Sequence, residues 1–594
     1  CNRTGTRAYI AGMGSNNLIV VNAPGDRAGL AETIPVGQGP TGVAVDDARS
    51  RVYVLNRFDG SLSVVSTATE TVLATVPFYD PTPTPIKVGR KHLYDTHKNS
   101  GLGQAACASC HIDARMDRLA WDLGDPQGAV KQLTGQNLGF GLPGLSPGGV
   151  QPANPPFAPW HPMKGPMTTQ TLQDIIGKEP HHWRGDRAGI EEFGPAFIGL
   201  LGDDTTLTAA EMQEFEDFLA TITFPPNPFR NFDNTLPANL SLPGQFTTGR
   251  FGPAGQPLPV GHPNNGLALY TNTTRRLDNG AFACVTCHTL PTGAGPDQTF
   301  SLATLSYSTL PPGPLGQRHL GLVSVDGSTN VSIKIPQLRN AYMKIGYEAT
   351  QQENNVGFGF VHDGSVDSLA RFVGEPVFTL QSDQEIADMV SFIMCLTGSD
   401  LPSGAPNTPF SPPGVLSQDV PASVGTQTTV LDGATAPAAQ TALINSMISL
   451  AQANKVGLIV KGIVGAEQRG FVYRSTSSLF QSDRAGQTLS PASLLALAHA
   501  GNELTYTVVP KNEDTRTGID RDEDGIFDRD QADLACYANC DGGHTPPILN
   551  VNDFSCFLNR FAAADPWANC DGSPSPPVLN VLDFSCFLNR FAAG

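Results

Sequence analysis

The sequence Cys-Ala-Ser-Cys-His at residues 107–111 governs how the middle of this chain folds, and its pattern returns as Cys-Val-Thr-Cys-His at residues 284–288. With 11 cysteines and 12 histidines among 594 residues, chance does not account for two copies. The pattern is typical of covalent haem attachment. Two thiols one helical turn apart can each add to a haem vinyl group, and the adjacent histidine then faces the iron. A zinc site needs a second ligand pair, and the sequence near either motif offers none. A redox dithiol does not require the histidine. The sequence therefore predicts two covalently bound haem c groups, held by Cys107, Cys110, His111, Cys284, Cys287 and His288.

The composition describes a long, turn-rich and acidic chain. At about 150 residues per domain, 594 residues suggest roughly four domains. Only 15% of the residues are charged, while 62 are Gly and 49 are Pro, which argues against a coiled coil or a helix bundle. A net charge of −18 argues against a nucleic-acid partner. No apolar run reaches the ~18 residues that span a bilayer, so no transmembrane segment is expected. Because the chain opens on Cys1, we expect the native N-terminus to lie upstream.

Residues 1–85 contain an internal repeat, in which the pattern around Tyr9 returns around Tyr53. Short alternating strands repeating every ~40–45 residues are typical of propeller blades. The segment resembles the YVTN-type β-propellers, which implies two blades of a partial, all-β propeller. The alternative is a small β-meander packed on the next domain.

Residues 86–235 and 236–400 each carry one Cys-x-x-Cys-His motif and similar stretches after it. The matching stretches are Lys164–Met167 with Lys334–Asn340, and His182–Asp186 with Val361–Ser365. Each half ends in an amphipathic helix pattern, Thr208–Ile222 and Ser382–Leu396. We expect tandem, mainly α-helical cytochrome c domains that arose by duplication.

Residues 401–515 carry no chemical motif and predict a small α+β accessory domain. Strands are expected at 457–464, 471–474 and 504–509, and helices within 430–450 and at 491–500.

Residues 516–534 hold alternating acidic residues with Gly525 at the sixth position of the loop. Oxygen ligands spaced in this way bind Ca²⁺ in EF-hand-type loops. The predicted calcium ligands are Asp520, Asp522, Asp524 and Asp528. Position twelve is Gln531, so Asp530 or Asp533 is expected to supply the last ligand. The alternative is a solvated acidic linker.

Residues 535–594 repeat with a period of 30 residues, since Cys540 returns as Cys570 and Cys556 as Cys586. The repeat resembles a tandem type I dockerin, which implies Ca²⁺ binding and a cohesin-like anchoring partner. The ligands that this resemblance implies are Asn539, Asp541, Asn550, Asp553, Asn569, Asp571, Asn580 and Asp583. Disulfides between residues 540 and 556 and between 570 and 586 would close each loop onto its helix, although other pairings remain open.

The central region resembles the bacterial di-haem cytochrome c peroxidase and MauG family. The resemblance lies in residues 88–111, in His182–Arg187, and in Ile335–Asn340 followed by Phe360–Val366. It implies an enzyme that reduces hydrogen peroxide at one haem and receives electrons through the other from a small donor protein. Two positions depart from the family pattern: Gln127 stands where a distal histidine is common, and Pro376 where a ligand Met is expected.

Other residues are therefore candidates for the sixth iron ligands, namely Met163, Met167, Met343 and His362. Packing in the core is the alternative for the methionines. Glu191, Glu192 and Asp203 lie near the sequence position of the catalytic acid in that family. Trp183 or Trp121 is a candidate electron relay between the haems, and a core Trp is the alternative.

The sequence thus predicts a multidomain protein: a partial β-propeller, tandem cytochrome c domains, an α+β domain, a calcium loop and dockerin-like helical repeats. Cytochrome maturation implies a periplasmic, extracellular or cell-surface location. The favoured function is an exported di-haem oxidoreductase that reduces hydrogen peroxide. The alternatives are a non-catalytic electron-transfer cytochrome and a surface scaffold acting through the propeller and dockerin modules.

Overall fold

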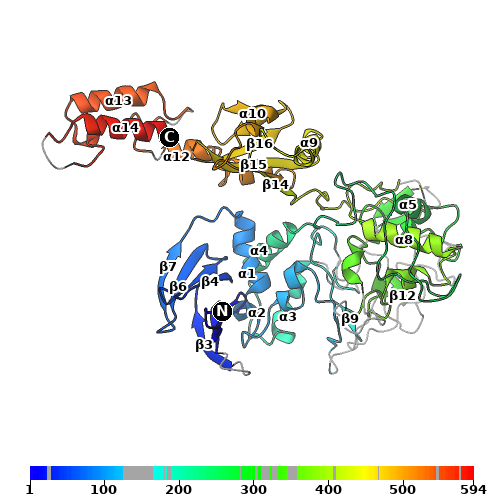
Figure 1. The fold of residues 1–594 in the computed structure, drawn as a ribbon. Helices are drawn as coiled ribbons and strands as arrows, with labels where there is room; N and C mark the ends of the chain where they lie inside the picture. Colours follow the sequence, from blue (N-terminus) through cyan, green and yellow to red (C-terminus); the bar gives the residue numbers. More distant parts are fainter. Residues whose placement is uncertain are drawn as a thin grey trace. The chain divides into compact units, whose positions relative to one another are not determined.

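The computed structural model describes residues 1–22, 29–124, 127, 165–179, 181–183, 187, 189–280, 282–295, 298–301, 306–309, 321–323, 332–345, 357–405, 408, 410–465, 467–534, 536–543, 547–573 and 577–593. The chain forms two compact units (Figure 1). Unit 1 comprises residues 1–231 and 235–419, and unit 2 comprises residues 232–234 and 420–594. Both units combine sheets and helices, so the chain is a multidomain protein of mixed α/β type. Every helix among the described residues is too short or too polar to cross a lipid bilayer.

The N-terminal part of unit 1 consists of two antiparallel meanders. The first contains β1 (Arg7–Gly12), β2 (Asn17–Asn22) and β3 (Gly29–Pro35); the second contains β4 (Pro40–Asp46), β5 (Arg51–Asn56), β6 (Ser61–Ser66) and β7 (Val72–Pro77). Alternate side chains of β2 and β5, such as Val20 and Val54, are buried in one shared core. In the sequence repeat, β1 and β2 correspond to β5 and β6. Among the described residues these sheets close no ring, so the structure shows meanders, and the propeller assignment stays a prediction.

The two motif-bearing halves share one plan, with a helix before the motif packed on the last helix of the half. In the first half the elements are α1 (Thr84–Tyr94), α2 (Thr96–Asn99), η1 (Cys107–Ser109), η2 (Ile112–Ala114), β8 (Ala120–Trp121), β9 (Met167–Thr168), η3 (Ile190–Phe193), α3 (Gly194–Gly199) and α4 (Ala209–Ala220). In the second half they are α5 (Pro263–Tyr270), α6 (Cys284–Cys287), β10 (Gln298–Ser301), β11 (Ser306–Thr309), β12 (Gly321–Val323), β13 (Ser332–Lys334), η4 (Ala341–Lys344), α7 (Leu369–Val373) and α8 (Asp383–Cys395). The helices are short, and much of each half is loop.

A glycine allows the close helix crossing in both halves. A Cβ at Gly89 of α1 would lie 2.3 Å from the Glu214 carbonyl oxygen of α4, and one at Gly266 of α5 would lie 2.0 Å from the Asp388 carbonyl oxygen of α8. No side chain fits at such distances. The last helices begin where the sequence predicts, because Thr208 and Ser382 accept hydrogen bonds from backbone N–H groups of the first turn. The helix crossings are alike in the two halves, and the duplication stays a prediction.

Unit 2 contains a six-stranded antiparallel sheet with strand order β14-β19-β15-β16-β17-β18. Its elements are β14 (Gln427–Val430), α9 (Ala438–Gln452), β15 (Gly457–Val464), β16 (Glu467–Arg474), β17 (Leu479–Ser482), β18 (Thr488–Leu489), α10 (Pro491–Leu495), β19 (Leu504–Val509), α11 (Asp514–Gly518) and α12 (Asp528–Leu534). The predicted strands are confirmed. The helix expected at 491–500 is shorter in the structure and ends at Leu495; the chain then turns at Gly501, whose φ is 83°, before β19.

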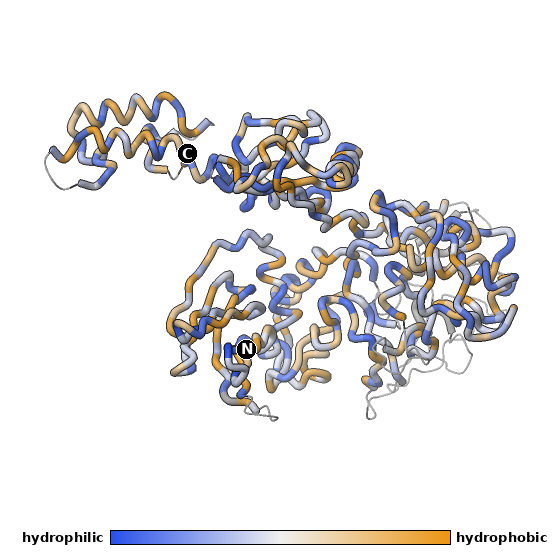
Figure 2. The backbone as a smooth tube through the Cα atoms, in the orientation of Figure 1, coloured by the Kyte–Doolittle hydropathy of each residue, from blue (hydrophilic) through white to orange (hydrophobic). Residues whose placement is uncertain are grey.

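The C-terminal repeat forms two helices, α13 (Val551–Ala562) and α14 (Val581–Ala593), with the short η5 (Pro566–Ala568) between them. Disulfides join Cys540 to Cys556 and Cys570 to Cys586, which confirms the expected pairing. Polar and apolar residues alternate along both helices (Figure 2). The helices bury an aromatic core in which the Phe557 and Phe587 rings are stacked with their centroids 4.1 Å apart.

Replacing Phe587 with alanine should lower the free energy of unfolding of this repeat by about 3–5 kcal/mol, because the ring is fully buried and its loss leaves a cavity. The matched control is Leu588→Ala on the exposed side of the same helix, which should cost less than about 1 kcal/mol. Denaturant unfolding of the full chain measures both. Equal effects of the two substitutions would contradict the packing described above.

Candidate functional site

The first motif begins in η1, and His111, which follows this turn of helix, is half-buried. The His111 Nδ1 atom lies 2.8 Å from the backbone carbonyl oxygen of Gln170. A carbonyl oxygen only accepts hydrogen bonds, so Nδ1 carries the proton and Nε2 carries the free lone pair. Burial lowers the pKa of His111, which favours the neutral ring. A neutral imidazole whose Nδ1–H is held by a hydrogen bond is oriented to bind a metal through Nε2.

The second motif repeats this arrangement in α6. The His288 Nδ1 atom lies 2.8 Å from the Gly293 carbonyl oxygen and 3.1 Å from that of Pro336. The Tyr270 hydroxyl donates a hydrogen bond of 2.5 Å to the backbone carbonyl of His288 and so fixes the end of the motif. Burial lowers the pKa of His288 as well. Both histidines therefore offer Nε2 in the form that binds iron.

All four motif cysteines are free thiols in the structure. Burial raises the pKa of Cys107 to about 11 and that of Cys284 to about 12, so both thiols are protonated at neutral pH. A structural zinc site would require further ligands beside these residues. Among the described residues, the only group of three or more acidic, His or Cys ligands lies elsewhere, at residues 520–524. Free thiols beside a neutral histidine match the donor set of c-type haem attachment, so the residues fit that group.

Trp183 lies where the two halves of unit 1 meet. Its side chain is 5% exposed, and its Nε1–H donates a hydrogen bond of 2.7 Å to the Thr168 carbonyl oxygen. The Lys344 ammonium of the second half lies 4.7 Å from the centre of the indole ring. The Thr168 N–H in turn donates to the His362 carbonyl oxygen at 2.7 Å. Trp183 therefore bridges the motif-bearing halves, as a relay requires.

The alternative relay residue, Trp121, lies at the surface and is 40% exposed. Its Nε1–H donates to the Asp117 carboxylate at 2.6 Å. Of the two tryptophans, the structure brings only Trp183 to the buried contact between the halves. A relay role for either stays a prediction.

The other predicted residues of the central region are more scattered. Glu191 is exposed on η3, and Glu192 beside it is half-buried. Met167 lies on β9 and Met343 in η4, both half-buried, and His362 is half-buried as well. Met163 and the stretch Arg184–Asp186 lie outside the described residues. Roles as sixth ligands and acid catalysts therefore stay predictions.

Sequence reasoning missed the backbone carbonyls of Gln170 and Gly293, and it missed Lys344. Every residue type has a backbone carbonyl, so no sequence signal could have identified these two partners. Lys344 carries no motif either. Burial lowers its pKa to about 8.

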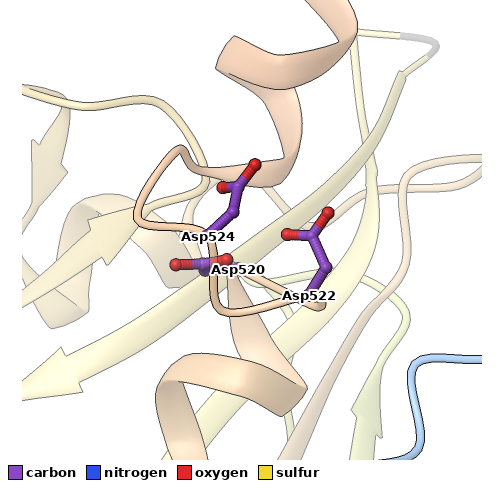
Figure 3. Close-up of side chains that lie close together, drawn as sticks. All are labelled: Asp520, Asp522 and Asp524. Atoms are coloured by element: carbon purple, nitrogen blue, oxygen red, sulfur yellow. The ribbon is translucent and has the colours of Figure 1, made fainter.

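The predicted calcium loop brings three carboxylates together. Oxygens of Asp520, Asp522 and Asp524 all lie within 4.8 Å of one another (Figure 3). The carboxylate of Asp528 makes different contacts. Its Oδ1 accepts the Arg521 backbone N–H at 2.9 Å and pairs with the Arg521 guanidinium at 3.1 Å.

The expectation that Asp530 or Asp533 completes this loop is wrong. The Asp530 Oδ2 accepts the Ala485 N–H at 2.7 Å, and Asp533 forms an ion pair of 3.0 Å with Arg484. Both carboxylates are buried. They hold α12 against residues 484–485 and are therefore not available to a cation in the loop.

In the C-terminal repeats, the predicted ligands occupy matching positions. The Asp541 N–H donates to Asp553 at 3.1 Å, and the Asp571 N–H donates to Asp583 at 3.2 Å. Asn550 and Asn580 begin the helices, and their backbone N–H groups donate to the same two carboxylates at 2.8 Å. The Oδ1 atoms of Asn539 and Asn569 are buried and have no hydrogen-bond partner among the described residues. The two loops are thus built alike.

Comparisons with known proteins add little to this geometry. No protein-family model and no curated protein sequence matches the chain. Among solved structures, the chain is similar to hydrazine synthase from Kuenenia stuttgartiensis, with 13% identity over 53% of this chain and 89% of that chain and a TM-score of 0.29. A likeness at this level carries no argument about function. The case for a function therefore rests on the two Cys-x-x-Cys-His motifs and on the contacts that prepare their histidines.

Proposed function

We propose that this chain is an exported di-haem c-type oxidoreductase that reduces hydrogen peroxide with electrons relayed between its two haems. The observation that carries the proposal is the matched preparation of His111 and His288. Each holds its Nδ1 against a backbone carbonyl and follows a pair of free cysteines. Haem held there would supply the redox chemistry that peroxide reduction needs.

The residues of the chain have separate roles in this proposal. Cys107, Cys110, Cys284 and Cys287 would hold the two groups covalently, and the two histidines would bind the iron through Nε2. The Gln170 and Gly293 carbonyls keep those rings oriented. Trp183 provides an aromatic path between the halves. Each peroxide takes up two electrons and two protons, its O–O bond breaks, and two waters leave; Glu191 and Glu192 are the proposed proton donors.

Export and the electron donor follow from two further properties. The two disulfides of the C-terminal repeats favour an oxidising compartment such as the periplasm or the cell surface. The net charge of −18 favours a small donor protein with a basic surface, because opposite charges speed encounter.

The anchoring function of the C-terminal repeats is a second candidate that one observation favours. Val551 and Val581 are exposed at equivalent positions of α13 and α14, and so are Leu558 and Leu588. Exposed apolar side chains at matched positions are typical of a docking surface. We propose a cohesin-like partner for this surface, with Ca²⁺ held in the two disulfide-closed loops.

The peroxidase proposal predicts the spin state of the irons. In the half-reduced full chain, produced with a cytochrome maturation system, electron paramagnetic resonance should show one high-spin haem, and added peroxide should change the optical spectrum. Two low-spin haems whose spectra do not change with peroxide in any redox state would contradict the peroxidase proposal. They would favour a non-catalytic electron-transfer cytochrome. Protein expressed without the maturation system is the control and should lack both signals.

A further inference from the structure

The loop between α11 and α12 contains a buried carboxylate oxygen without a partner. Asp520 is 4% exposed, and its Oδ2 accepts the Gly525 N–H at 3.2 Å. Its Oδ1 has no hydrogen-bond partner among the described residues. Asp522 and Asp524 bring their carboxylates to the same point (Figure 3).

The electrostatics of this arrangement require a positive charge. Oxygens of Asp520, Asp522 and Asp524 lie within 4.8 Å of one another, and Asp520 is buried. Burying a charged oxygen beside like charges costs free energy unless a cation lies among them. Oxygen-only ligands select a hard cation such as Ca²⁺.

Gln531 reaches the position that the last ligand of such a loop occupies. Its Nε2 donates hydrogen bonds to Asp522 Oδ2 at 2.8 Å and to Asp524 Oδ2 at 3.1 Å. A rotation of the amide by half a turn exchanges its nitrogen and oxygen and leaves the shape of the side chain unchanged. Gln531 therefore lies over the cluster and presents an amide oxygen to a cation after that rotation.

We propose that residues 520–531 bind one Ca²⁺ ion and that Gln531 is its position-twelve ligand through the amide oxygen. The ion is held by three carboxylates and one neutral side chain, instead of the usual set completed by a bidentate carboxylate. Because affinity follows the charge and number of ligands, the dissociation constant lies at about 10⁻⁴–10⁻³ M, as in extracellular modules. This site is independent of the haem proposal.

Binding here orders the start of α12. The Asp528 N–H donates to the Ile519 carbonyl oxygen at 2.7 Å, so the two ends of the loop already meet. An ion between these ends fixes the loop in place, while Asp530 and Asp533 hold the rest of the helix. Hydrogen exchange in this segment should therefore report the ion directly.

The test is peptide-resolved hydrogen exchange on the full chain during titration with CaCl₂. In the wild type, Ca²⁺ should slow exchange at residues 520–531 with a midpoint in the range given above. Gln531→Glu should lower that midpoint about 10-fold or more by adding a charge, and Gln531→Leu should raise it by a similar factor. Gln213→Leu, an exposed substitution in α4, is the matched control and should leave the midpoint unchanged.

Two outcomes would overturn the proposal. One is exchange at residues 520–531 that does not respond to about 10 mM Ca²⁺, well above the expected range. The other is a Gln531→Leu chain whose midpoint equals that of the wild type, which would remove Gln531 from the ligand set. Since peptides from residues 536–593 are read separately, Ca²⁺ binding in the C-terminal repeats does not obscure either result.

Discussion

The double variant Cys284→Ala/Cys287→Ala should lose one of the two covalently bound haems that we propose and should keep the other. The motif cysteines are the only covalent attachment points that the proposal provides for the second group, and alanine has no thiol to add to a vinyl group. The intact mass of the denatured chain measures the result as one attached prosthetic group in place of two.

The first motif offers the reciprocal experiment, and Cys1 offers the control. Cys107→Ala/Cys110→Ala should remove the other group, while replacement of the exposed Cys1 should remove neither. A wild-type chain that carries no prosthetic group after production with a maturation system would end the redox proposal. The anchoring proposal for the C-terminal repeats would be unaffected.

Replacing Arg339 with methionine should destabilise unit 1 by about 3 kcal/mol, because it breaks a buried ion pair between the two halves. The Arg339 and Asp174 side chains are 2% and 1% exposed. The Arg339 guanidinium also lies 4.1 Å from the centre of the Phe224 ring. Lys178 remains beside Asp174 at 2.6 Å, which keeps the loss near the lower end of the range for such pairs. Denaturant unfolding measures the change.

The matched control is Arg371→Met, which removes a pair of 3.3 Å with Asp367 in which the arginine is 66% exposed. Water screens such a pair, so the expected loss is below about 1 kcal/mol. Losses of equal size at Arg339 and Arg371 would show that the contact between the halves does not depend on the buried pair.

The parts of the structure that local sequence could predict are those fixed by local rules. Thr208 and Ser382 begin helices because their side chains cap the first turn. Buried and half-buried residues alternate along most of the strand at 504–509, as expected for a strand with one buried face. The pairing of Cys540 with Cys556 is one that the short repeated loop suggested, although the sequence left other pairings open. Each of these features depends on neighbours a few residues away.

The parts that could not be predicted depend on residues far apart in the chain. Asp530 looks like a calcium ligand in the sequence, but in the structure its carboxylate accepts a hydrogen bond from the Ala485 N–H, 45 residues earlier. The partner of His111 is a backbone carbonyl 59 residues away, which any residue type would supply. Gly89 and Gly266 have the same role in the two halves. Only the folded structure shows which of the many glycines lie at a helix crossing too close for a side chain.

The disulfides of the C-terminal repeats have a mechanical consequence. Each one spans a sequence separation of 16 residues and ties a loop to the helix that follows it. A protease that cuts once between Cys540 and Cys556 opens the ring but leaves both pieces joined through sulfur. A single cut inside either disulfide-closed loop therefore does not detach the part of the chain that follows it.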